Sequence, residues 1–542
     1  MTDTVDHRLR SAWTPRGAAA ADVTPKVLRW LAERIGTPGA SASVVPDAAL
    51  EVPSSSLPRR TRAGLAAVVG AEHVLVDPAE RLGRCGGLSY LDLLRRRRPE
   101  LGLTVPDAVV LPADPDQVQR VLDVCVEGDI GVVPFGGGTS VVGGVTALRG
   151  DKEAVIVLDL ARLDRLVSLD PDSRVAVLQA GVRGPEAERM LGDRGFTLGH
   201  VPQSFERATI GGFAATRSAG QASSGYGRFE DMVVGVRLAT PRGEWRLGVA
   251  PASAAGPDLR QLAVGSEGTL GVLTEVAVRV RPAPAAERYE AFALDGWQRG
   301  TSAVRELAQR GLLADVTRLS DPDETDSSLA LAGGWKTALL RRYLRGRGIG
   351  EPCLLVLGWH GASAREIARR RRAAIRVLRP EGAVALGAAV GEAWRRGRFA
   401  GPRQRDALLD LGVCVETLET ATYWSRLDEL RDRVRAALRD SLDHPLVLCH
   451  VSHAYETGAS LYFTVLAVRD EADPAGQWER AKRAASEAIA DGSLGTITHH
   501  HAVGTDHAPY LRAEIGDLGA DVLAAARRAV DPTGILNPGK LV

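Results

Sequence analysis

The sequence predicts an α+β protein of more than one domain, with two main parts that meet near residue 285. Three observations support this prediction. The chain has 542 residues, which exceeds one ordinary domain. From residue 106 onward, short apolar strands alternate with amphipathic helices and glycine-rich turns. Pro282, Ala283, Pro284 and Ala285 then form a stiff hinge, after which long arginine-bearing helices mix with strands.

Composition and charge exclude several classes of protein. The 45% of apolar and 25% of charged residues are ordinary for a globular chain. Because 68 basic residues face 67 acidic ones, no global field attracts nucleic acid, and we expect no nucleic-acid partner. The five cysteines form no CxxC pair, and no apolar run has the length of a signal or membrane segment. We therefore expect a soluble protein of the reducing cytoplasm.

The first hundred residues are predicted to be mostly helical. KVLRWLAERIG is a helix that Thr24 caps and Pro25 opens. The run Arg95–Arg98 has no aromatic residues interleaved, so we interpret it as a solvated helix end rather than a nucleic-acid patch.

From residue 106 the elements follow in a regular order. DAVVLP is a strand, DPDQVQRVLDVCVEG a helix and IGVVPFGGGTS a strand that runs into glycines, which together make a βαβ unit. We predict further strands in EAVIVLDL, SRVAVLQAGV, DMVVGVRLATP, GVLTEVAVRVRP, CLLVLGWHG and SLYFTVLAV, and helices in GPEAERMLGDRG and near 476–490.

Three loops of glycine and hydroxyl residues lie next to these strands. The first holds Gly136, Gly137 and Gly138, the second runs from Thr209 to Gly212, and the third spans 264–272. Successive N–H groups in such turns form anion-binding nests. The spacing is neither GxGxxG nor GxxxxGK[ST], which excludes the Rossmann and Walker motifs. One extended ligand such as a dinucleotide would suit all three loops; three unrelated loops are the alternative.

Histidines are concentrated in one segment. Seven of the eleven lie between His444 and His507, and His499, His500 and His501 are consecutive. Neighbours on an extended chain point to opposite faces, so at most two of the three share a pocket without a turn. Imidazoles suit proton transfer, anion binding or metal ligation, and the run predicts a functional site.

The segments PFGGGTSVVGG, QSFERATIGG with ATRSAG, and GSEGTLGVLTE resemble the three FAD-contacting segments of the vanillyl-alcohol oxidase/p-cresol methylhydroxylase superfamily. The resemblance implies a two-part FAD-binding domain of the p-cresol methylhydroxylase type at 100–285. Around it we expect an N-terminal region at 1–99, an α+β cap domain at 286–505, and a C-terminal segment at 506–542 that returns to the FAD domain. The first loop has no His or Cys for a covalent link, so non-covalent FAD is implied. The implied FAD contacts are Pro134, Phe135, Gly136, Gly137, Gly138, Thr139, Ser140, Gln203, Ser204, Thr209, Gly211, Gly212, Thr216, Arg217, Ser218, Glu267, Gly268, Thr269, Leu270, Gly271 and Val272.

From about residue 85 onward the chain resembles the alkyldihydroxyacetonephosphate synthase family, through THHHAVG, SLYFTV, GYGRFEDMVV and DPTGILNPGKL. The resemblance implies exchange of the acyl group of acyl-dihydroxyacetone phosphate for a long-chain alcohol, through a flavin N5 adduct, in ether-lipid synthesis. It implies a catalytic Tyr462, a catalytic run His499, His500 and His501, a functionally important Arg318, and Arg405 as the arginine that binds the substrate anion.

Members of the superfamily that oxidise 2-hydroxy acids carry GHxGDGN and EHG segments, some of which hold a metal. This chain has Cys449 to His453 and His499 to Ala502 at those places, which disfavours a carboxylate-anchored metal. We expect no metal, although an all-nitrogen zinc site stays open. The alternative function is an FAD-linked oxidase or dehydrogenase of a 2-hydroxy acid or related alcohol; a non-catalytic flavin-binding protein is a third.

The termini lack the peroxisomal targeting signals of eukaryotic members, which is typical of a bacterial homologue. Relatives are commonly dimers that touch membranes peripherally, so the resemblance implies a homodimer with a lipid substrate and allows a membrane contact. No amphipathic segment in the sequence demands that contact.

Overall fold

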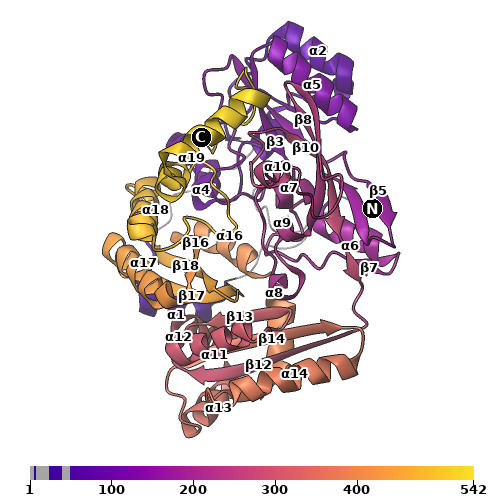
Figure 1. Cartoon of the computed structure of the whole chain (residues 1–542). Coiled ribbons are helices and arrows are strands. Elements are labelled where there is room, and N and C mark those ends of the chain that lie inside the picture. Colours follow the sequence, from indigo (N-terminus) through magenta and orange to yellow (C-terminus); the bar gives the residue numbers. More distant parts are fainter. Residues whose placement is uncertain (1–4, 8–22, 40–48, 542) are drawn as a thin grey trace.

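The computed structural model describes residues 5–7, 23–39 and 49–541, and two sheets organise the part before residue 280 (Figure 1). The first sheet has the order β1-β2-β4-β3, with β4 parallel to both β2 and β3. The second is antiparallel in the order β5-β6-β10-β8-β9. The strands are β1 (Val74–Leu75), β2 (Ala108–Val110), β3 (Ile130–Phe135), β4 (Ala154–Asp159), β5 (Leu166–Asp170), β6 (Val175–Gln179), β8 (Val233–Thr240), β9 (Gly243–Leu247) and β10 (Val272–Arg279).

Local signals in the sequence explain these elements. Helix α5 (Pro115–Glu127) begins where the Asp114 carboxylate accepts a hydrogen bond from the Gln117 backbone N–H at 2.8 Å. It buries Val118, Val121, Leu122 and Cys125, whose helical spacing puts them on one face. The predicted βαβ unit is therefore confirmed. Other helices in this part are α2 (Arg59–Val69), α6 (Gly184–Gly192), α7 (Ile210–Ala215), α8 (Ser223–Tyr226), α9 (Phe229–Met232) and α10 (Leu259–Ala263).

Residues 286–468 form a seven-stranded antiparallel sheet of order β15-β12-β14-β13-β17-β18-β16. Its strands are β12 (Ala286–Asp295), β13 (Val316–Ser320), β14 (Pro352–Gly361), β15 (Val384–Gly387), β16 (Val413–Tyr423), β17 (Leu446–Ala454) and β18 (Gly458–Val468). The connecting helices are α11 (Trp297–Gln309), α12 (Pro322–Ala332), α13 (Gly334–Gly346), α14 (Ala364–Leu378), α15 (Ala388–Gly397), α16 (Gly401–Asp410), α17 (Leu427–Ser441) and α18 (Pro474–Ala490).

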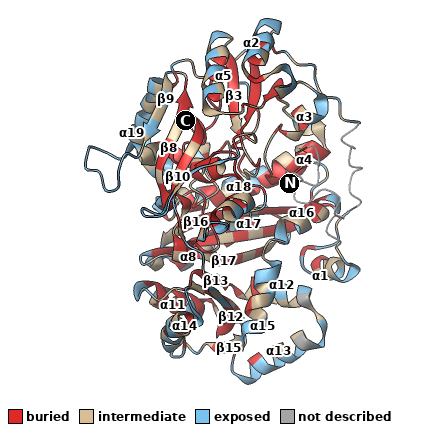
Figure 2. Cartoon of the chain, turned by 90° about the vertical axis from the view of Figure 1, so that its right-hand side faces the viewer, coloured by how far each residue is buried: buried red, intermediate tan, exposed pale blue. Residues whose placement is uncertain are grey.

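The two faces of this sheet have different environments. Helices α11, α14, α17 and α18 pack on the face that carries Leu461 and Phe463, and together they form one buried core, visible in red in Figure 2. Since side chains alternate along a strand, Tyr462 points to the opposite face. That face lies toward the first part of the molecule, because His453 Nε2 is 3.0 Å from the carbonyl oxygen of Gly220, in the segment that follows the second glycine loop.

The chain end returns to the first part of the molecule, as predicted. After α19 (Ala508–Val530), Leu536 forms a parallel bridge with Val132 of β3. The Val132 N–H donates to the Ile535 carbonyl at 2.8 Å, and the Asn537 N–H donates to the Val132 carbonyl at the same distance. Two short strands, β7 (Phe196–Thr197) and β11 (Arg281–Pro282), pair where the chain leaves this part. The predicted α+β architecture is confirmed.

The helices of the first hundred residues pack on both parts. Helix α1 (Pro25–Ile35) begins at the predicted Thr24 cap and buries Leu31 and Ile35 against β16 and β18. Helix α3 (Pro78–Gly83) precedes α4 (Tyr90–Arg97), which packs on the core of the seven-stranded sheet. The prediction of a solvated end at Arg95–Arg98 was wrong, because Arg97 is buried with its Nε 2.7 Å from the Asp410 carboxylate.

Within the described residues, none of the helices combines the length and the apolar character needed to cross a bilayer.

Candidate functional site

The three glycine loops converge at the carboxyl end of β3. A Cβ atom on Gly137 would lie 2.3 Å from the Arg207 carbonyl oxygen, so only glycine permits the first and second loops to touch. The third loop joins them, because the Glu267 N–H donates to the Ala215 carbonyl at 3.0 Å. Gly268, with φ of +77°, packs on Pro134. The loops therefore build one site, as a single extended ligand requires.

The first loop fits a pyrophosphate. Among the described residues, the backbone N–H groups of Gly137, Gly138 and Thr139 have no hydrogen-bond acceptor. Successive N–H groups that lack a partner inside the protein are the donors that a dinucleotide phosphate takes. The first loop thus has the N–H donors that the phosphates of the predicted dinucleotide need.

The other predicted cofactor residues hold the loops in shape. Thr209 caps α7 by accepting a hydrogen bond from Gly212 N–H, and Arg217 donates to the carbonyls of Val264 in the third loop and of Gln261 in α10. Ser218 Oγ is 3.0 Å from His200 Nε2, while Gln203 reaches the cap part through the Arg398 carbonyl. Pro134 and Phe135 end β3, and Gly136 to Ser140 directly follow it. Ser204 lies in the turn before Thr209, and Thr216 follows α7. Glu267, Gly268, Thr269, Leu270 and Gly271 lead into β10, which Val272 begins.

A row of polar side chains crosses the open face of the seven-stranded sheet. Tyr462 of β18 is paired directly with Glu419 of β16 on one side and with His450 of β17 on the other. The Tyr462 ring stacks on His450 with centroids 4.9 Å apart. The structure thus brings the predicted tyrosine into the same face as the predicted histidines, because His501 lies 5.6 Å from its ring.

Arg318 joins this row from β13. Its guanidinium is 3.1 Å from His450 Nδ1 and 3.0 Å from the Glu324 carboxylate. Burial opposes ionisation of Glu324, but His450 and Arg318 outweigh it and hold the pKa of that carboxyl far below its usual value. Arg318 is therefore anchored beside the ring that stacks on Tyr462.

Arg405 lies on the other side of Tyr462. An arginine in an amphipathic helix ordinarily faces solvent, yet Arg405 is 7% exposed in α16. It donates to the Leu88 carbonyl at 2.5 Å and lies 3.5 Å from the Glu416 carboxylate, while its Nε has no acceptor among the described residues. A buried cation with a spare donor suits an anionic substrate group.

The histidine run folds around a carboxylate. The backbone N–H groups of His499, His500 and His501 all donate to Glu419, at 2.9 to 3.0 Å. Burial, the largest effect, lowers the pKa of His501 to about 3 and that of His499 well below its usual value, so both are neutral at pH 7. Three consecutive histidines can share one site only if the chain turns, and the hydrogen bonds to the Glu419 side chain hold this turn.

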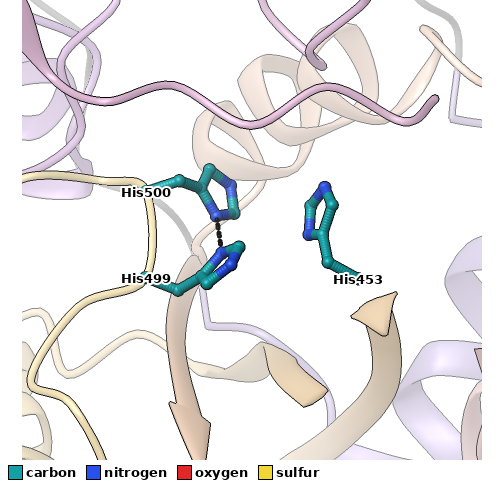
Figure 3. Close-up of side chains that lie close together, drawn as sticks. All are labelled: His453, His499 and His500. Carbon is teal, nitrogen blue, oxygen red and sulfur yellow. Dashed lines mark hydrogen bonds between the residues drawn. The ribbon is translucent and has the colours of Figure 1, made fainter. Parts of the chain in front are cut away.

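His453 faces the run across the site (Figure 3). Donor atoms of His453, His499 and His500 lie within 4.8 Å of one another, a grouping that could hold a metal ion. However, His453 Nε2 is bonded to Gly220, and the Nδ1 atoms of His499 and His500 are 3.0 Å apart. This arrangement fits a hydrogen-bonded imidazole cluster, and the expectation of no metal stays a prediction.

Sequence reasoning missed Glu324, Glu416, Glu419 and Tyr455. The segment VCVETLET contains a usable signal, because Glu416 and Glu419 are charged residues in the mostly buried first part of β16. Their partners come from distant segments, which the sequence pattern does not reveal.

Comparison with known proteins shows the family of the chain. Residues 106–247 match the family described as "FAD binding domain", and 283–541 match "FAD linked oxidases, C-terminal domain". An alkyldihydroxyacetonephosphate synthase of Dictyostelium discoideum is 31% identical over 86% of this chain and 78% of its own. A solved alkyldihydroxyacetonephosphate synthase, 27% identical, superposes with a TM-score of 0.81 over 95% of this chain and 92% of that chain. A p-cresol methylhydroxylase structure shares the fold, with a TM-score of 0.66 at 15% identity over 89% of this chain and 96% of that one. The chain is an FAD-linked enzyme and belongs to the alkyldihydroxyacetonephosphate synthase family.

Proposed function

We propose that the protein exchanges the acyl group of acyl-dihydroxyacetone phosphate for a long-chain alcohol, which gives an alkyl ether and releases the fatty acid. The observation that carries the proposal is the polar row of Glu419, Tyr462 and His450, which lies on the sheet face toward the first part of the molecule. Such an exchange needs proton transfer at the substrate carbon, and a phenol among neutral imidazoles can provide it.

The charge of each side chain indicates its role in this reaction. Burial raises the pKa of Tyr462 to about 12, so at neutral pH the residue carries its proton and acts with a neighbouring imidazole rather than as a free phenolate. Arg405 and Arg318 are the cations that suit the phosphate and the departing carboxylate. The three glycine loops would hold FAD without a covalent link. When bound, the flavin supplies covalent catalysis at its N5 atom.

One experiment separates this function from oxidation of a 2-hydroxy acid. FAD-loaded protein is mixed anaerobically with lactate or glycolate, and in parallel with acyl-dihydroxyacetone phosphate and a long-chain alcohol. We expect no bleaching of the flavin by the acids, and release of fatty acid with an ether product of the correct mass. Bleaching by an acid, without an ether product, would replace the proposal by the oxidase alternative.

Exposed apolar residues favour a peripheral membrane contact. Trp335, Leu339 and Tyr343 of α13 are 73%, 58% and 46% exposed and follow one another at helical spacing. The exposed Arg342 and Arg345 accompany them, a composition typical of helices that lie on anionic bilayers. The sequence had indicated no such segment.

The homodimer and the cytoplasmic location belong to the same proposal. The five cysteines are buried and form no disulfide among the described residues, which supports a reducing compartment, and the family resemblance supports the dimer. Sedimentation of the purified protein tests the dimer directly.

A further inference from the structure

Glu419 has the environment of a functional carboxylate rather than of a packing residue. It is 1% exposed, and no arginine or lysine forms a salt bridge with it among the described residues. Its charge is instead compensated by the loop that carries the histidines. A buried carboxylate without a cation is costly unless hydrogen bonds replace its hydration, so its surroundings need an explanation.

The two carboxylate oxygens have different partners. Oε1 accepts from the N–H groups of His499, His500 and His501 and from Thr498 Oγ1 at 2.7 Å, so its acceptor positions are filled. Oε2 accepts from the His499 N–H at 2.9 Å and faces His500 Nδ1 at 3.3 Å. His500 is thus the imidazole aligned with the incompletely used oxygen, since His499 Nδ1 is farther away at 3.8 Å.

This geometry decides between two tautomers. The Nδ1 atoms of His499 and His500 are 3.0 Å apart, so one of them holds a proton and the other accepts it. If His499 were the donor, the lone pair of His500 Nδ1 would face an anionic oxygen. If His500 is the donor, its N–H goes to His499 Nδ1, and the anionic Glu419 oxygen 3.3 Å from His500 Nδ1 favours the proton on that nitrogen. His499 then carries its own proton on Nε2, 2.5 Å from the Tyr455 hydroxyl, which accepts it.

We infer that Glu419 is the positioning residue of the histidine run: it fixes His500 with the proton on Nδ1 and leaves Nε2 to exchange a proton on the Tyr462 side of the site. The use of this proton in catalysis rests on the proposed function. The tautomer itself follows from the contacts that Glu419, His499 and His500 make in the protein. In Figure 3 the His499 and His500 rings meet through their Nδ1 atoms, with His453 opposite.

The charges around His500 determine how removal of the Glu419 charge should change protonation of the imidazoles. Besides Glu419 of β16, it faces His499 and His501 of its own loop, His453 of β17, Tyr462 of β18 and the more distant His200. Of these, only Glu419 is an anion at neutral pH. Replacing that anion by a neutral amide should disfavour protonation of the imidazole cluster.

The test compares Glu419→Gln with Glu290→Gln. Glu290 on β12 is a buried carboxylate of the same sheet, pairs with Arg371 of α14, and among the described residues contacts none of the site residues. After chelator treatment, we measure flavin content, the dependence of kcat on pH, and ¹⁵N-histidine NMR spectra. In Glu419→Gln we expect retained FAD, kcat lowered about tenfold or more, and the pH midpoint of activity lower by about one unit. Glu290→Gln should match the wild type in all three.

NMR on the wild type keeps the inference testable if Glu419→Gln does not fold. The resonance lost in His500→Gln identifies His500, and its proton should sit on Nδ1. A proton on Nε2, or a Glu419→Gln variant with unchanged kcat and pH midpoint, would overturn the inference. Because the tautomer is read without any substrate, failure of the proposed reaction alone would leave this result standing.

Discussion

At the scale of single residues, loss of the Tyr462 hydroxyl should impair catalysis without disturbing the fold. The ring is held by β18 and by stacking on His450, and neither contact needs the oxygen. Tyr462→Phe should therefore keep the fold and the FAD but lower kcat about 100-fold or more. Flavin absorbance and single-turnover assays measure the two effects, with Tyr423→Phe at the exposed end of β16 as the control. Full activity in Tyr462→Phe would remove the residue from the mechanism.

Site residues could be predicted from the sequence where they belong to a recognisable sequence motif. The histidine run was predicted from the residues themselves and Tyr462 through the family resemblance that SLYFTV supports, and the structure brings them together. Glu419 was not predicted, because its role depends on strand register: it opposes Tyr462, 43 positions further along the chain, and receives a loop from 80 positions away. Arg405 was found only through the family resemblance, since a helical arginine is ordinarily solvent-facing.

At the scale of elements, the first glycine loop gives a sharp prediction. In Gly137→Ala the new Cβ would meet the Arg207 carbonyl at 2.3 Å, and a backbone atom cannot move aside as a flexible side chain can. The loop must then shift, and FAD should bind about tenfold more weakly or worse, a loss of about 1.4 kcal/mol. Fluorescence titration of the apoprotein with FAD measures it. Gly192→Ala in α6, where an added Cβ meets nothing within 4 Å, is the matched control, and equal affinities in the two variants would exclude a role for Gly137.

Helix α13 gives a second prediction at this scale. Replacing Trp335 and Leu339 by serine removes apolar area that would otherwise enter a bilayer, so binding to vesicles of mixed neutral and anionic lipids should fall about tenfold or more. Cosedimentation measures this effect. Leu518→Ser with Val522→Ser in α19 is the control, because those residues are 77% and 58% exposed at the same spacing. A similar loss in both double variants would contradict a docking role for α13.

Elements were predicted well where a periodic pattern had a clear start and stop. The Asp114 cap, the proline and the buried face of helix α5 all lie within residues 114–127 of the sequence. The exposed face of α13 was missed because an amphipathic pattern does not reveal whether another element covers it. The prediction for Arg95–Arg98 failed for the same reason, since α4 is covered by the cap core.

At the scale of the whole molecule, the chain crosses repeatedly between its parts. The segment at 503–504 donates its N–H groups to Glu267, and Asn537 Nδ2 donates to the carbonyls of Gly144 and Glu267. Sequence patterns are local, so they do not show which segments such contacts join. The return of the C-terminus came instead from the family resemblance. The four-part division at 99, 285 and 505 stays a prediction.

The buried histidines predict how stability depends on pH. Burial lowers the pKa of His200, His453 and His501 to about 3 and that of His507 to about 4. Below pH 6.5 the unfolded chain takes up protons on these four groups while the folded chain does not, so each one lowers the free energy of unfolding by about 1.4 kcal/mol per pH unit. Burial also raises the pKa of Glu267 to about 7 and that of Asp321 to about 6, which acts in the opposite direction as the pH falls.

Burial also lowers the pKa of four further histidines (His7, His360, His450 and His499) and raises that of four further carboxyls (Asp92, Glu188, Glu230 and Glu416). The histidines still outnumber the carboxyls, so the protein should lose stability between pH 6.5 and pH 5. Urea unfolding at pH 7.5, 6.5 and 5.0 with FAD in excess measures the change. A second series with His200→Asn, which removes one titrating group from the unfolded chain, should fall less steeply. Stability that stays constant or rises over this range would mean that the histidines take up protons in the folded state, and the neutral imidazole cluster around Glu419 would then be wrong.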